Sequence, residues 1–297
     1  MDTITAYELD IESQTGMLES YRPQRPLPAK KQKNTVFAGS GDSLAAAMLA
    51  ERHSGGLARA ADPLELYRNP SIAESKDVYF VSVSGNTISN VRAAKRTNST
   101  AITSDPASRL ARASGSVITV GPGCGTFTAG SVTFLECALA CVSLVRRIRV
   151  PRSRAIFNAA RLAARTRTSG RVFILGSYHT YPLAMYGAAK FYEVLGHDAH
   201  YTRMEQFSHM ELFCADKGDT VIILEEKNPH NRELRHSLKK AGIKTIQPDV
   251  PSAKIPQLVY CTVFLQMLVL YEAKRLKLSE CHFVTSKMRK TSNDMIY

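Results

Sequence analysis

Short apolar runs alternate along the chain with longer segments that place apolar residues three to four positions apart. In the first half, the apolar runs end at Gly, Ser or Asn, as strands commonly do, and the segments between them have helical periodicity. The pattern predicts strands at 34–38, 58–61, 78–83, 99–103 and 116–120, separated by helices at 43–53, 62–67, 87–96, 106–113 and 129–148.

The same alternation returns in the second half. It predicts helices at 153–166, 181–195, 205–212, 230–241 and 255–275, with strands at 171–175, 199–201, 220–224 and 243–247. Strands that alternate with helices are typical of parallel sheets covered on both faces. We therefore expect an α/β protein of two tandem domains, each a doubly wound parallel sheet flanked by helices. An N-terminal lead-in would occupy 1–33, and the domains 34–150 and 151–297, with the boundary near 150–153.

Two loops rich in serine and glycine follow strands of the first half. One reads Gly39-Ser-Gly-Asp-Ser43 and the other Ser82-Val-Ser-Gly-Asn-Thr87. A small, hydroxyl-rich turn between a strand and a helix suits a phosphate, because main-chain N–H groups and hydroxyls donate to the anion and the helix dipole favours it. Either loop alone could be an ordinary turn capped by Ser or Thr, but two of them favour phosphate binding.

The composition limits the classes of protein that we consider. The chain has 297 residues, 44% of them hydrophobic, which is enough for two ordinary domains. We expect no membrane span and no secretory signal. The six cysteines show no CxxC spacing, so we interpret them as reduced core residues of a cytoplasmic protein and expect no zinc site.

The net charge of +13 raises the question of an anionic partner. Basic residues are dispersed, with local clusters at 30–33, 146–154 and 287–290, and no basic strand is interleaved with aromatic residues. We therefore do not expect nucleic acid as the primary ligand. A basic surface also raises the encounter rate with a small anionic substrate.

The stretch Leu175-Gly-Ser-Tyr-His-Thr-Tyr-Pro-Leu-Ala-Met-Tyr-Gly-Ala-Ala-Lys-Phe-Tyr-Glu193 carries the sharpest signal. Lys190 and Glu193 share one helix face, and His209 follows Glu193 by sixteen positions. The pattern G-x4-Y-P-x-A-x2-G-A-x-K-x2-E with this histidine resembles the isomerase half of glucosamine-6-phosphate synthase. The loop at 82–87 looks like the same family's S-x-S-G-x-T loop, and the layout also resembles archaeal bifunctional phosphoglucose/phosphomannose isomerases. The chain is thus identified as a double sugar-isomerase (SIS) domain protein over roughly 34–290.

The resemblance implies a role for individual residues. Glu193 would be the base that moves a proton between C1 and C2, and His209 would assist ring opening, reaching the site from the neighbouring subunit of a homodimer. Lys287 matches the C-terminal lysine that meets the open-chain ketose. Phosphate would be bound by Ser40, Ser43, Ser82, Ser84 and Thr87, supported by Gly39, Gly41, Gly85, Asn86 and Lys190. No cofactor or metal is implied.

Physical chemistry supports these roles but leaves structural alternatives. An enediol route needs a carboxylate over both carbons, a cation or donor for the oxyanion, and an acid/base group at the ring oxygen. A glutamate on a helix face is otherwise often just solvated, His209 could be a cap or core residue, and Lys287 belongs to a basic tail. Lys190 could act mainly as an electrostatic partner of Glu193.

The chain departs from the family patterns at three places. Tyr186 stands where the synthase has a glutamate, and the loop at 121–130 lacks the arginine of the bifunctional isomerases. Only 33 residues precede the first predicted strand, so we do not expect glutamine-dependent amination. We expect a metal-independent aldose–ketose isomerase of hexose 6-phosphates. The alternatives are a deaminase of glucosamine 6-phosphate and a phosphosugar-binding sensor without catalysis.

Overall fold

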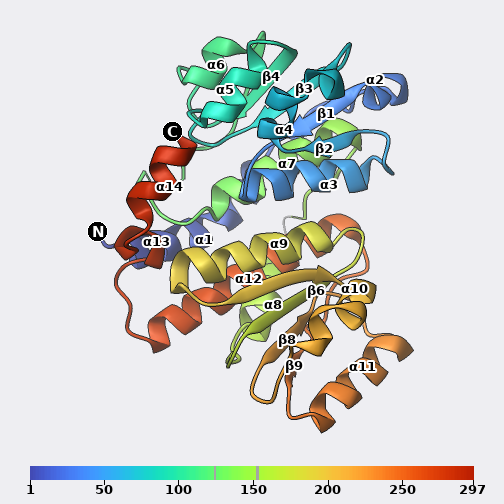
Figure 1. The fold of residues 1–297 in the computed structure, drawn as a ribbon, viewed down its shortest axis with the longest axis vertical. Coiled ribbons are helices and arrows are strands. Elements are labelled where there is room, and N and C mark those ends of the chain that lie inside the picture. The colour runs from blue at the N-terminus through green and yellow to red at the C-terminus, as the bar shows by residue number, and fades with distance from the viewer. Residues whose placement is uncertain (124, 152–153) are drawn as a thin grey trace. The chain divides into compact units, whose positions relative to one another are not determined.

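The computed structural model describes residues 1–123, 125–151 and 154–297, and the chain forms two compact units (Figure 1). We call the first the N-sheet unit; it comprises Glu19–Thr126, Gly130–Arg149 and Ser286–Tyr297. The second, the C-sheet unit, comprises Met1–Leu18, Phe127–Ala129 and Val150–Thr285. Each unit contains one parallel sheet with helices packed against it, so the expected α/β class with two parallel sheets is confirmed.

The N-sheet unit contains a five-stranded sheet in the order β2-β1-β3-β4-β5. Its strands are β1 (Thr35–Ala38), β2 (Arg59–Ala61), β3 (Asp77–Val81), β4 (Asn98–Thr103) and β5 (Ser116–Thr119), and all pairs are parallel. Its helices are α2 (Ala29–Lys33), α3 (Asp42–His53), α4 (Pro63–Arg68), α5 (Ile88–Ala94), α6 (Arg109–Ala113), α7 (Val132–Val145) and α14 (Arg289–Ile296), with a 3-10 turn at Pro70–Ala73.

The C-sheet unit contains a four-stranded parallel sheet in the order β7-β6-β8-β9. Its strands are β6 (Val172–Gly176), β7 (Ala199–Arg203), β8 (Thr220–Ile223) and β9 (Lys244–Ile246). Its helices are α1 (Thr3–Ser20, up to Leu18), α8 (Arg154–Ala163), α9 (Tyr181–Lys190), α10 (Met204–His209), α11 (Pro229–Lys240), α12 (Lys254–Arg275) and α13 (His282–Thr285), with a π turn at Phe191–Leu195 and a 3-10 turn at Glu211–Phe213.

Apolar content explains where the core lies in each unit. Strands β1, β6 and β8 are buried at every position, as expected of central parallel strands covered on both faces. In the N-sheet unit, helix α7 is buried at nearly every position and packs against α3. In the C-sheet unit, α12 is long and apolar enough to cross a membrane by length and composition, but 89% of its apolar window is buried. We therefore interpret α12 as a core helix.

The N-terminal segment differs from the expected lead-in. The lead-in begins with the 18-residue helix α1, which buries Tyr7, Ile11 and Gln14 in the C-sheet unit.

The predicted helix at 181–195 ends as an α-helix at Lys190 and continues as a π turn. Cys124 and the expected boundary residues Arg152 and Ser153 lie outside the described residues.

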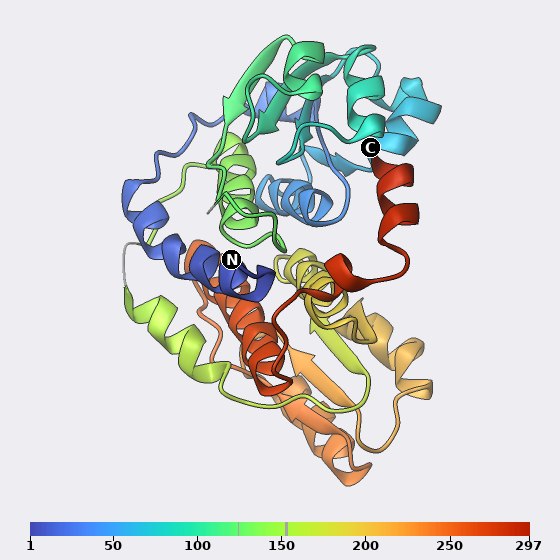
Figure 2. The same ribbon diagram turned by 90° about the vertical axis from the view of Figure 1, so that its left-hand side faces the viewer.

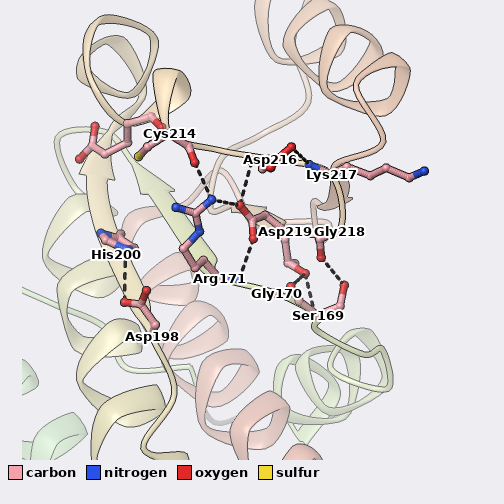
Figure 3. Close-up of polar contacts among 12 residues, drawn as sticks. Ser169, Gly170, Arg171, Asp198, His200, Cys214, Asp216, Lys217, Gly218 and Asp219 are labelled. Carbon is pink, nitrogen blue, oxygen red and sulfur yellow. Dashed lines mark hydrogen bonds and ion pairs between the residues drawn. The ribbon is translucent and has the colours of Figure 1, made fainter.

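A polar cluster closes the amino edge of the second sheet, opposite to the edge where its strands end (Figure 3). The Arg171 guanidinium donates to the Asp219 carboxylate at 2.8 Å and to the Cys214 carbonyl at 2.5 Å. Burial alone would raise the pKa of Asp219, but N–H donation from the Asp216 and Arg171 main chains and the Arg171 guanidinium outweigh it, so the pKa is lowered. The cluster fixes the start of β6 beside the start of β8.

Candidate functional site

The two hydroxyl-rich loops lie at the same edge of the first sheet. Strands β1 and β3 are parallel neighbours, with Ala38 paired to Phe80, so the loops that follow them leave from adjacent carboxyl ends. β2 lies on the other side of β1, so the chain changes direction between β1 and β3. In open α/β sheets, such a topological switch point is where ligands bind.

The second loop depends on Gly85, because any other residue at this position would strain the backbone and clash with Ser108. Gly85 has φ +61°, and its N–H donates to the Ser82 carbonyl at 3.0 Å. A Cβ at this position would lie 2.1 Å from Ser108 Oγ. The hydroxyls of Ser82 and Thr87 lie 3.3 Å apart, with Ser82 buried and Thr87 half-buried. The loop thus presents Thr87 beside a fixed turn.

Two polar side chains stabilise the loop itself. The Asn86 amide donates to the Ser84 carbonyl at 2.9 Å, and the Asn86 N–H donates to Ser84 Oγ at 3.3 Å. Ser84 is nevertheless exposed, so its hydroxyl can also face a ligand.

The first loop also depends on glycine. A Cβ on Gly39 would lie 2.6 Å from the Ser43 carbonyl carbon, so only glycine allows β1 to approach the start of α3 this closely. Gly41, with φ +57°, precedes the helix. Ser40 is exposed and Ser43 half-buried, which places two hydroxyls at the start of α3.

Two carboxylates that sequence reasoning missed lie close to Gly121 and Gly130, between β5 and α7. The Gly121 N–H donates to Glu136 Oε2 at 2.8 Å, and a Cβ on Gly130 would lie 2.7 Å from Asp42 Oδ2. Burial raises the pKa of Glu136, with the Gly121 hydrogen bond acting in the opposite direction. The loop at 121–130 therefore meets carboxyl groups where a bifunctional isomerase would place an arginine. A single glutamate within the apolar run 132–145 was the signal that could have revealed Glu136.

In the C-sheet unit, Lys190 and Glu193 form an ion pair at the end of α9. Lys190 Nζ lies 2.5 Å from Glu193 Oε2, and the lysine side chain is fully buried while 36% of the glutamate side chain is exposed. The ammonium also lies 4.9 Å from the centre of the Tyr186 ring. The π turn that carries Glu193 is a feature often found at functional sites. The arrangement offers an exposed carboxylate oriented by a cation that water does not reach.

A chain of buried polar groups continues from this pair. Gln266 Nε2 donates to the Tyr186 hydroxyl at 2.8 Å, and Gln14 Nε2 donates to Gln266 Oε1 at 2.7 Å. Tyr186 and both glutamines are fully buried. The chain thereby connects α1 through α12 to α9, which sequence reasoning missed because it treated residues 1–33 as a lead-in.

Tyr7 adds a second aromatic group near the ion pair. It is fully buried, and its hydroxyl has no hydrogen-bond partner among the described residues. Burial raises the pKa of Tyr7 well above its ordinary value; Tyr186 adds to the rise, whereas Lys190 opposes it. The N-terminal helix therefore contributes directly to the surroundings of Lys190.

The remaining candidates are exposed. His209 ends α10, and its ring lies 3.2 Å from Glu205 Oε1 with 67% of the histidine side chain exposed. Its described polar contact is therefore with Glu205 rather than with Glu193. Lys287 is exposed between α13 and α14 and belongs to the N-sheet unit. Across residues 1–123, 125–151 and 154–297, no group of three or more His, Cys, Asp or Glu side chains could hold a metal ion.

Solved structures with a similar fold include proteins named for sugar phosphates. A glucosamine-6-phosphate deaminase from Thermotoga maritima matches with a TM-score of 0.74 and 18% identity, covering 94% of this chain and 96% of that chain. At this level of identity the likeness shows a shared α/β fold with two parallel sheets flanked by helices. The C-terminal domain of glucosamine-fructose-6-phosphate aminotransferase from Francisella tularensis matches with a TM-score of 0.70 and 15% identity, over 94% and 97% of the two chains. Tagatose-6-phosphate ketose/aldose isomerase from Escherichia coli matches with a TM-score of 0.68 and 16% identity, covering 93% of this chain and 90% of that chain. No protein-family model and no curated protein matches the chain.

Proposed function

We propose that the protein is a metal-independent phosphosugar isomerase that interconverts aldose and ketose hexose 6-phosphates through an enediol. The observation that carries the proposal is the Lys190–Glu193 pair, in which a buried ammonium orients a partly exposed carboxylate. Its occurrence in a fold shared with a deaminase and a ketose/aldose isomerase of sugar phosphates supports the substrate class. The two parallel sheets would belong to tandem SIS domains, proposed at 34–150 and 151–297, in a cytoplasmic enzyme.

In the proposed mechanism, the sugar phosphate is held by hydroxyls at the β1/β3 switch point, chiefly those of Ser40, Ser84 and Thr87. His209 donates a proton to the ring oxygen while water accepts the proton of the anomeric hydroxyl, which opens the ring. Glu193 then removes the proton on the carbon next to the carbonyl, and the electron pair forms the enediolate. The same carboxyl returns this proton to the former carbonyl carbon, and the hydroxyl proton on the neighbouring carbon moves to the first oxygen. The neighbouring carbon is thereby left as the carbonyl, so atoms and charge balance. Lys287 would face the carbonyl oxygen and stabilise its developing charge.

Glu193→Gln tests the base. The change removes proton transfer but keeps the shape, so conversion of fructose 6-phosphate to glucose 6-phosphate should fall at least about 10³-fold while phosphosugar binding changes little. Glu233→Gln, at an exposed position of α11, is the matched control and should retain full turnover. Unchanged turnover in Glu193→Gln would sink the assigned mechanism.

The deaminase alternative is favoured by the likeness to the Thermotoga maritima enzyme. Glu193 and Lys287 would then handle an amino sugar and its imine, releasing ammonia from glucosamine 6-phosphate. Side-by-side assays of ammonia release and sugar interconversion distinguish the two reactions. Binding without turnover on fructose 6-phosphate, mannose 6-phosphate and glucosamine 6-phosphate would instead favour the sensor.

The exposure of His209 supports a homodimer in which this residue serves the partner's site. Mixing inactive His209→Asn with inactive Glu193→Gln protein should then restore part of the activity, because mixed dimers contain one intact site. A mixture that stays inactive, although subunits exchange, would contradict the shared site.

A further inference from the structure

Two basic clusters that lie far apart in the sequence form one surface of the N-sheet unit. Three hydrogen bonds join the chain before and within α2 to the end of α7: the Leu27 N–H donates to the Leu144 carbonyl at 2.7 Å, the Gln24 N–H to Ser143 Oγ at 3.0 Å, and the Gln32 amide to the Val145 carbonyl at 2.9 Å. Figure 2 shows the segment after α1 and the segment after α7 along the same side of this unit. We call the resulting surface the basic patch: Lys30, Lys31, Lys33, Arg146, Arg147 and Arg149.

The patch contains cations without internal counter-charges. All six side chains are exposed, and within the described residues none makes a hydrogen bond or an ion pair. The sequence has no Asp or Glu at 20–41 or at 137–192. Asp77 reaches the region from β3, where its N–H donates to the Asn34 carbonyl at 2.9 Å, but its carboxylate accepts from the Asn98 amide. Glu136 lies on α7 about 15 Å before Arg146.

Helix ends account for only part of this charge. Arg146 and Arg147 follow the last turn of α7, where a cation interacts favourably with the negative end of the helix dipole. One or two cations are enough to stabilise the end of α7. Six like charges gathered on one surface repel each other, which an anionic partner would relieve.

The surface chemistry narrows the class of partner. No large apolar side chain is exposed at 10–63 or, in the described part of the chain, at 128–161. An amphipathic membrane-binding surface inserts apolar residues, and a single-strand binder stacks bases on exposed aromatic rings. A purely basic surface can be attracted to anionic lipid only by charge. Contacts from Lys and Arg alone suit the phosphate backbone of a duplex, which is bound without reading the bases.

We propose that the basic patch binds the phosphate backbone of a nucleic-acid duplex, separately from the phosphosugar site. Sequence reasoning did not expect nucleic acid as the primary ligand, because the basic residues are dispersed and no basic strand is interleaved with aromatic residues. The hydrogen bonds from Gln24, Leu27 and Gln32 bring them together. The proposal concerns a second ligand and does not depend on the sugar reaction.

The test is fluorescence anisotropy of the full chain with a 20-bp DNA duplex and with an RNA duplex of the same length. If about four of the six cations contact phosphates, the logarithm of the binding constant should fall with the logarithm of salt concentration with a slope of about −4, or about 10²-fold between 50 and 200 mM salt. Preference for one duplex identifies the form that is bound.

Charge reversal at the patch is compared with a matched reversal elsewhere. Lys31→Glu with Arg147→Glu should weaken binding at least tenfold and reduce the slope by about two. Lys239→Glu with Lys240→Glu, exposed at the end of α11, changes the net charge equally and should alter binding less than threefold. If the reversal unfolds the protein, Arg147→Gln alone should reduce the slope by about one.

Three outcomes would overturn the proposal. One is no duplex binding at 50 mM salt. The second is equal weakening by both reversals, which would mean general charge attraction. The third is tighter, patch-dependent binding to phosphatidylserine vesicles than to either duplex.

Discussion

Lys190→Met separates the structural and the functional contribution of the buried lysine. At an effective dielectric constant of 20, opposite charges about 3 Å apart attract by about 5–6 kcal/mol. Removing the fully buried ammonium from water costs several kcal/mol, which offsets most of that attraction. Methionine has a similar volume, so no large cavity forms. Glu193 keeps access to water through its exposed 36%.

These terms predict a small change in stability and a large change in turnover. The free energy of unfolding should fall by about 0–2 kcal/mol, which lowers Tm by less than about 8 °C. Turnover of the phosphosugar should fall at least about 10²-fold, because the carboxylate loses the group that orients it. The assay combines thermal unfolding with the coupled isomerase measurement below 30 °C, where the variant stays folded.

Lys274→Met is the matched control. Lys274 Nζ lies 2.5 Å from Glu8 Oε1, the same distance as in the buried pair, but 46% of the lysine side chain is exposed. An exposed pair contributes about 0–1 kcal/mol, and turnover should not change. The reasoning is refuted if folded Lys190→Met keeps turnover within threefold of the wild type, or if it loses far more than 2 kcal/mol of stability.

The remaining predictions concern the phosphate loop, the sheet edge and the buried polar chain. Gly85→Ala should cost about 2–4 kcal/mol and abolish phosphosugar-induced thermal stabilisation, whereas Gly55→Ala, with φ +68° and no atom within 4 Å of the new Cβ, should cost only about 1–2 kcal/mol. Because the pKa of Asp219 is lowered in the folded protein, its contribution to stability is present above about pH 4 and lost at lower pH. In urea unfolding, Asp219→Asn should therefore be destabilised at pH 6 and approach the wild type near pH 3; an equal deficit at both values would contradict the assignment. Gln266→Leu leaves the Tyr186 hydroxyl without its donor, and should cost about 1–3 kcal/mol by thermal unfolding and lower kcat more than it raises KM; a purely structural role would leave kcat unchanged.

The features that follow from local chemistry were predictable from the sequence. The two parallel sheets follow from alternating apolar runs and helical segments. The central strand β1 lies within its predicted range, and β6 ends one residue beyond its predicted end. The close approach at Gly39 and the positive φ at Gly85 are local requirements that leave a mark in the sequence.

The features that depend on tertiary packing were not predictable. Helix α1 buries Asp10 and Gln14, whose polarity weakens the amphipathic signal that would place the helix in a core. The complete burial of Lys190 depends on neighbours distant in sequence, as does the π turn that breaks the predicted helix at 181–195. Conversely, the sequence predicted functional positions for His209 and Lys287 without showing that both are exposed.

The two sheets have related topologies, but the residues at their switch points differ. Gly176 approaches the start of α9 as Gly39 approaches α3, since a Cβ at either would lie 2.6 Å from main-chain carbon. After β6, however, Pro182 removes an N–H from the first turn of α9, and the Thr180 hydroxyl is engaged with Ser177.

The second switch point therefore does not suit a phosphate. A cavity of about 170 Å³ there is lined in part by Glu225 and Glu226, whose carboxylates repel an anion. The β1/β3 edge offers hydroxyls and glycines on both loops, together with the carboxylate of Asp42 at the start of α3. If the proposed function holds, the N-sheet unit holds the phosphate, and each chain has one phosphate-binding switch point rather than two.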